Sequence, residues 1–128
     1  MTKARGSFAV TSWHEDPYEE LEGGGKLTRA SVEQTFTGDI SGDGAVQWLM
    51  SYRSDGTARF VGLQRVRGSV GDRSGSFVLE TAGDFDGNEA KGTWSVVAGS
   101  GTAGLTGLCG AGMFRAPKAS FELDYEFA

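Results

Sequence analysis

The chain has 128 residues, of which 38% are hydrophobic, 11% aromatic and 23% charged. This length fits one domain over residues 1–128, and the charged residues are too few and too interspersed for a disordered chain. A formal net charge of −5, without a cluster of lysine or arginine, argues against nucleic acid and membrane surfaces as partners.

Short runs of β-branched and aromatic residues, separated by glycine and aspartate, follow one another along the chain. Their period of two predicts β-strands, and 21 glycines beside only two prolines suit turns and strands rather than linkers. We predict about eight strands, over residues 6–15, 26–39, 45–53, 57–70, 74–82 and 90–98, within 105–114, and over 119–127.

The acidic segment 16–25 joins the first two predicted strands, and we expect it to be the longest loop, with room for one helical turn before its glycines. Both prolines are expected in connections. The inward parity of these two strands stays open, because a bulge near Ser12 would exchange Trp13 with His14.

Aspartate–glycine pairs predict turns further along the chain. Asp43-Gly44 and Asp55-Gly56 predict tight hairpin turns on either side of the third strand, because aspartate and glycine tolerate the positive φ angles that such turns need. Asp84 to Asn88 predicts a further hairpin turn rather than a calcium loop, since the glycine and the twelfth position do not fit the calcium pattern.

Each predicted strand has one apolar face, which must be buried. Antiparallel strands of this kind either close on themselves or split into two sheets, and closure best removes the unpaired edges. We therefore predict an all-β fold with a single eight-stranded antiparallel barrel, a meander of the lipocalin type. Such a barrel is either filled by its side chains or holds one small ligand.

Familiar catalytic and cofactor motifs are incomplete. Residues 99–104 match G-x-G-x-x-G, but no helix pattern follows, so a glycine-rich strand connection is the better interpretation. His14 is the only histidine, which excludes a histidine-rich metal site. We expect no metal and no cofactor. Cys109, the only cysteine, cannot form an internal disulfide, and we expect a buried, inert thiol.

The localisation expected from the sequence is cytoplasmic. Residues 1–7 lack the apolar segment of a secretory signal, and no apolar stretch approaches the roughly 18 residues that span a bilayer.

Several segments together resemble the DUF3224 family, and the resemblance runs nearly from end to end. The residues that carry it lie in 6–15, 27–32, 38–39, 49–52, 60–62 and 71–77, and in Gly99-Ser100-Gly101-Thr102. The resemblance implies a barrel similar to allene oxide cyclase. Relatives of that barrel cyclise or isomerise a hydrophobic substrate in the lumen, or, as dirigent proteins, steer a coupling without catalysing it, and neither class needs a metal or cofactor.

We therefore expect a barrel that binds a hydrophobic small molecule and acts on it as a cyclase or isomerase. Glu15 and Tyr52 are the candidate proton carriers, chosen by residue type and expected position. Glu33 and Glu80 are expected to face water. The candidate ligand-binding residues are Trp13, Gln34, Trp48, Phe60, Gln64, Phe77 and Trp94, with Gln34 and Gln64 as orienting hydrogen-bond groups.

Two other classes of function stay open. The barrel could bind a ligand without catalysis, as lipocalins do, or serve as a structural module with a filled lumen. A pocket of roughly 300 Å³ or more would favour a ligand, whereas a packed lumen would exclude one. We also expect a homo-oligomer, because Val61 and Leu63 give the outer surface an apolar character.

Overall fold

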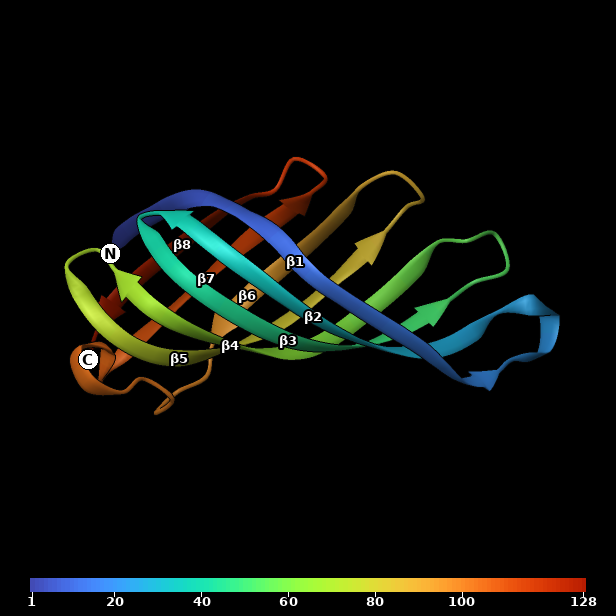
Figure 1. The fold of residues 1–128 in the computed structure, drawn as a ribbon, viewed down its shortest axis with the longest axis horizontal. Helices are drawn as coiled ribbons and strands as arrows, with labels where there is room; N and C mark the ends of the chain where they lie inside the picture. The colour runs from blue at the N-terminus through green and yellow to red at the C-terminus, as the bar shows by residue number, and fades with distance from the viewer.

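The computed structural model describes residues 1–128, and its eight strands form a closed antiparallel barrel in sequence order (Figure 1). The predicted all-β class and eight-stranded barrel are confirmed. The strands are β1 (Thr2–Glu20), β2 (Lys26–Gly38), β3 (Ile40–Tyr52), β4 (Ala58–Val70), β5 (Arg73–Phe85), β6 (Ala90–Val96), β7 (Leu108–Ala116) and β8 (Ser120–Phe127), with 3-10 turns η1 (Glu22–Gly24) and η2 (Ala103–Leu105). Neither helical turn has the length that a membrane-spanning helix requires.

The segment between the first two strands differs from the prediction. β1 continues to Glu20, so the expected long loop shrinks to residues 21–25, which still contain the helical turn η1. Pro17 lies inside β1 rather than in a connection, next to a bulge between Pro17 and Glu19. A proline is tolerated there because this part of β1 pairs only with β2, so its missing N–H faces no second strand.

The turn predicted at Asp43-Gly44 is also wrong. Both residues lie within β3, and the chain turns five residues before Asp43, at Gly38, which has a φ of 113°. Gly44 serves a different purpose: a Cβ atom there would lie 2.6 Å from the Phe36 ring. Asp55-Gly56 does form the β3–β4 turn, and residues 86–89 form the β5–β6 turn, where Asp86 accepts hydrogen bonds from the N–H groups of Asn88 and Glu89.

A bulge sets the inward face of β1. Val10 pairs with Gln34 and Ser12 pairs with Glu33, so Thr11 is the extra residue. Beyond the bulge Trp13 pairs with the buried Val32 and therefore shares the inner face of the barrel, while His14 faces out.

The end of the barrel that holds the β2–β3 and β4–β5 turns is packed solid. Phe36, Ile40, Val66, Val70 and Phe77 are at most 2% exposed there. Leu105 of η2, with no exposed surface, adds to this packing, since η2 lies against β5. Side chains therefore fill this half of the lumen.

The seam that closes the barrel is short. β1 pairs with β8 over six residues, Thr2 to Ser7, whereas β3 and β4 pair over 13. Beyond the seam, β1 has β2 as its only strand neighbour up to Glu20. Figure 1 shows the consequence: the β1–β2 hairpin extends past the other hairpins at its end of the barrel.

Candidate functional site

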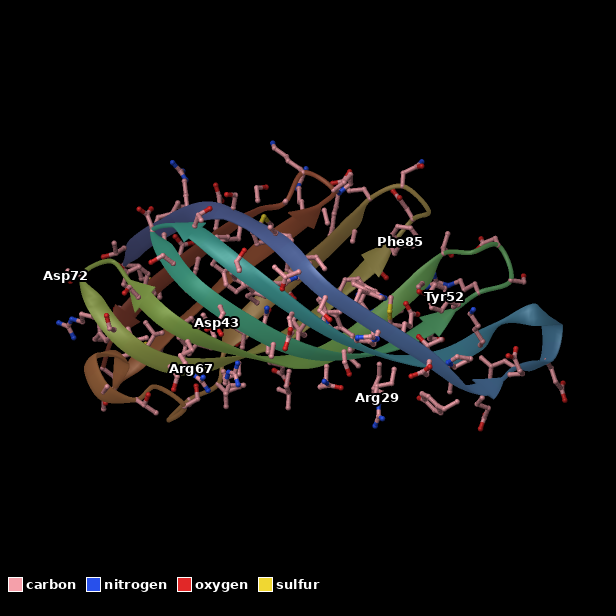
Figure 2. All side chains as sticks on the ribbon, in the orientation of Figure 1. Arg29, Asp43, Tyr52, Arg67, Asp72 and Phe85 are labelled. Atoms are coloured by element: carbon pink, nitrogen blue, oxygen red, sulfur yellow. The ribbon has the colours of Figure 1, made fainter.

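A cavity of about 330 Å³ occupies the half of the lumen opposite the packed end. It lies where the hairpins β1–β2, β3–β4, β5–β6 and β7–β8 meet, and Figure 2 shows two of its residues, Tyr52 and Phe85, near this end. Its wall contains no charged side chain, and half of its 14 residues are aromatic: Phe8, Trp13, Trp48, Tyr52, Phe60, Phe85 and Phe114.

The aromatic wall follows from the alternation of the strands. Trp48 packs against Phe60, with 5.3 Å between ring centroids, and stacks on Phe114 at 6.2 Å. Trp13, whose side chain the Thr11 bulge directs inward, lies 5.9 Å from Trp48 and is 45% exposed. Trp13 therefore forms the border between the cavity and solvent.

Glu15 and Tyr52, the two candidate proton carriers, are hydrogen-bonded to each other. The Tyr52 hydroxyl donates to Glu15 Oε2 over 2.8 Å, and Thr28 Oγ1 donates to the same oxygen over 2.7 Å. Trp13 Nε1 donates to Glu15 Oε1 over 3.0 Å. Three neutral donors thus hold one half-buried carboxylate at the mouth of the cavity, and no lysine, arginine or histidine forms an ion pair with it.

Tyr52 titrates abnormally because of this position. Partial burial, the hydrogen bond to Glu15 and the negative charge of Glu15, in that order of size, together raise the pKa of its phenol to about 12. The phenol therefore keeps its proton throughout the physiological range and acts as a hydrogen-bond donor.

A polar vestibule lies outside the Glu15–Tyr52 pair. This second hollow, of about 480 Å³, is lined by Glu15, Lys26, Thr28, Tyr52 and Arg53 among others. Tyr52 belongs to the walls of both spaces, so the pair stands where the apolar cavity meets the polar entrance.

Two buried amides meet deeper in the lumen. Gln64 Nε2 donates to Gln34 Oε1 over 2.6 Å, and the two side chains are 1% and 5% exposed. Gln34 also lines the cavity. Because its oxygen is engaged by Gln64, its own N–H₂ group is left to bind an acceptor in the lumen.

Five residues predicted to bind or act on a ligand line the cavity: Trp13, Gln34, Trp48, Tyr52 and Phe60. Glu15 stands at its rim. Gln64 and Trp94 border only a small void beneath the cavity, too narrow for a water molecule, because Gln34, Trp48 and Phe114 come between. Phe77 lies away from the cavity, 1% exposed within the packed half.

The structure adds lining residues that the sequence reasoning missed. Phe8 could have been found by its alternation with Val10 along β1. Phe85, Asn88, Ala90, Ala116 and Pro117 come from the β5–β6 and β7–β8 hairpins, whose approach to the lumen depends on barrel closure.

The remaining reactive groups lie elsewhere. Glu33 and Glu80 are exposed, as expected, whereas Cys109, expected to be buried, is only half-buried. Nowhere do three or more histidine, cysteine, aspartate or glutamate side chains gather closely enough to hold a metal ion.

Comparison with known proteins places the barrel in a family. The family model described as "Protein of unknown function (DUF3224)" matches residues 4–128. A crystal structure of a protein of unknown function from the DUF3224 family of Shewanella oneidensis MR-1 is 28% identical, with a TM-score of 0.82 over 100% of this chain and 98% of that one. No curated protein matches the sequence.

Proposed function

The chain belongs to the DUF3224 family, whose members have no assigned activity. We propose that the protein binds a hydrophobic small molecule in its lumen. The observation that carries the proposal is the cavity of about 330 Å³ with an aromatic wall free of charge. Cavities of about 300 to 1,000 Å³ that combine apolar walls with a few polar groups are typical ligand sites.

The volume limits the size of the ligand. A molecule with roughly one or two rings, or an alkyl chain of similar bulk, fits the apolar half, and the Gln34 N–H₂ group offers a donor to an oxygen on it. Because the half of the lumen opposite the packed end is hollow, a structural module with a filled interior is disfavoured.

Acid–base isomerisation or cyclisation is the second candidate function, favoured by the Glu15–Tyr52 pair. A carboxylate at the edge of an apolar cavity can take a proton from a substrate carbon and return it to another atom, so no oxidant or reductant is needed. Tyr52 would hold the carboxylate in place through its hydrogen bond of 2.8 Å. Without turnover, the same site describes a non-catalytic binder.

A variant that fills the lumen tests binding directly. Ala90 lines the cavity, so Ala90→Phe should abolish the binding of a hydrophobic fluorescent dye. Ala111→Phe is the matched control, because Ala111 is exposed on the outer face of β7. Native mass spectrometry of the protein purified from cells, followed by organic extraction, would identify any retained molecule. Equal dye binding by both variants would sink the proposal.

Catalysis needs a separate test on any ligand so identified. Glu15→Gln should remove turnover while the ligand still binds, since the amide cannot accept a proton but keeps the size of the side chain. Turnover that survives in Glu15→Gln would exclude Glu15 as the proton carrier, and absence of turnover in the unmodified protein would leave the binder as the better description.

A further inference from the structure

We infer that the ligand of this lumen carries a positively charged amine beside its hydrophobic body, and that Glu15 is the counter-charge. This inference rests on the proposed function and adds the chemical class of the ligand. It is argued from the charges at the mouth of the cavity.

Glu15 is a formal negative charge in direct contact with the wall of the apolar cavity, through its hydrogen bonds to Trp13 and Tyr52. No lining residue of the cavity is charged. Glu15 accepts hydrogen bonds from Trp13, Thr28 and Tyr52, all neutral, so its negative charge is solvated and held in place but not cancelled. A carboxylate held in this way offers its remaining lone pairs to a cationic donor, and such charge-assisted hydrogen bonds are stronger than neutral ones.

The aromatic residues around Glu15 suit a cation as well. Ammonium groups are attracted to the faces of tryptophan and tyrosine rings. The Tyr52 ring already holds one, because Lys26 Nζ lies 5.4 Å from its centroid on the vestibule side. Trp13, partly exposed at the mouth, presents a second ring within hydrogen-bond reach of Glu15.

The β1–β2 hairpin carries an excess of negative charge outside the vestibule. Five carboxylates, Glu15, Asp16, Glu19, Glu20 and Glu22, lie between residues 14 and 26, against one lysine, Lys26. The hairpin projects beyond the barrel at this end (Figure 1). A surface of one charge sign raises the local concentration and the association rate of ligands of opposite sign.

A carboxylate ligand is the competing possibility, because Lys26 and Arg53 line the vestibule. Arg53 is an exposed side chain whose guanidinium donates to Thr57, and its charge already interacts with Asp55. Lys26 is exposed and lies over Tyr52. An anionic head placed near them would also face Glu15, and the repulsion would cost binding energy.

Three probes that share a phenylbutyl group and differ in their polar end distinguish an amine ligand from a carboxylate ligand. Binding of 4-phenylbutylamine, 4-phenylbutanol and 4-phenylbutanoate is measured at pH 7 by isothermal titration calorimetry. We expect the amine to bind about tenfold more tightly than the carboxylate, with the alcohol between them, and the difference to shrink as salt is added. Glu15→Gln should abolish the preference, whereas Glu33→Gln, which removes an exposed carboxylate from the outer face of β2, should retain it.

The outcomes separate this inference from the proposal beneath it. Equal binding of the three probes, or tighter binding of the carboxylate, overturns the amine assignment and leaves lumen binding standing. Failure of all three probes to bind counts against lumen binding itself. If Glu15→Gln proves unfolded by circular dichroism, the salt dependence of the amine preference in the unmodified protein decides the matter.

Discussion

Tyr52 is the residue whose chemistry most directly reports the site. The chain has three tyrosines, and Tyr52 is the one whose pKa burial and Glu15 raise to about 12. In an absorbance titration near 295 nm we expect one phenol to ionise around pH 12 and Tyr52→Phe to remove that step. Ionisation of all phenols around the ordinary pH of about 10 would contradict the Glu15–Tyr52 hydrogen bond.

The raised pKa of Tyr52 predicts that the folded protein loses stability at high pH. Because the folded state keeps the Tyr52 proton up to about pH 12 and the unfolded chain releases it near 10, the folded state binds more protons between these values. The contribution of Tyr52 is therefore fully present below pH 10 and lost as the pH rises through 12. Urea unfolding at pH 9 and at pH 11.5 should show a smaller loss of stability in Tyr52→Phe than in the unmodified protein.

The Gln34–Gln64 pair is expected to contribute to stability as a unit. Gln64→Leu leaves the Gln34 oxygen buried without a donor, and should lower the free energy of unfolding by about 1 to 3 kcal/mol. Gln34→Leu combined with Gln64→Leu removes both polar groups and should recover much of that loss. Urea denaturation of the unmodified protein, Gln64→Leu and the double variant gives the comparison. A double variant less stable than Gln64→Leu would show that the unpaired Gln34 oxygen does not cause the loss of stability.

Several glycines on the inner face of the barrel lie directly against aromatic rings. The closest of these contacts is between Gly92 of β6 and Phe114. A Cβ atom there would overlap the ring of Phe114. We expect Gly92→Ala to lower the free energy of unfolding by about 1 to 3 kcal/mol, because the Phe114 ring must shift against its neighbours Trp48, Phe60 and Trp94. Thr93→Val, at the next residue on the exposed outer face, should change it by less than about 0.5 kcal/mol. Equal effects of the two substitutions would contradict the contact.

Much of the strand pattern could be predicted from the sequence, because alternation within a strand needs only local information. The inward faces of β3, β4, β6 and β8 followed from it. A bulge near Ser12 stayed open in the sequence analysis, and it lies at Thr11; the passage of β1 through Pro17 could not be predicted, since it depends on which side of β1 a neighbouring strand lies. Glu15 and Tyr52 were chosen by residue type and expected position; they lie on β1 and β3, on either side of β2, and the register of these strands brings the Tyr52 hydroxyl within 2.8 Å of Glu15.

At the scale of the whole molecule, the outer face of β3 to β6 supports the expected self-association. Leu49, Val61 and Leu63 are about half exposed, at 49%, 47% and 57%, and line a groove of about 530 Å³ that runs over β3 to β6. Leu63→Asp should reduce the molar mass measured by light scattering during size-exclusion chromatography. Thr35→Asp, on the exposed outer face of β2, is the control for the added charge. An unmodified protein that elutes as a monomer at all concentrations would contradict this prediction.

The short seam between β1 and β8 is the one strand pairing that joins distant parts of the chain. Each of the other seven strand pairs joins neighbours in the chain, so it can form as a local hairpin, whereas the seam joins Thr2 to Tyr125. Its six residue pairs must therefore offset the entropy of closing a loop that contains almost the whole protein. A circular permutant that links residue 128 to residue 1 and opens the chain at Gly87 would turn the seam into a local hairpin. The long-range closure would then fall to β5 and β6, so the position of the break would decide which ladder forms last.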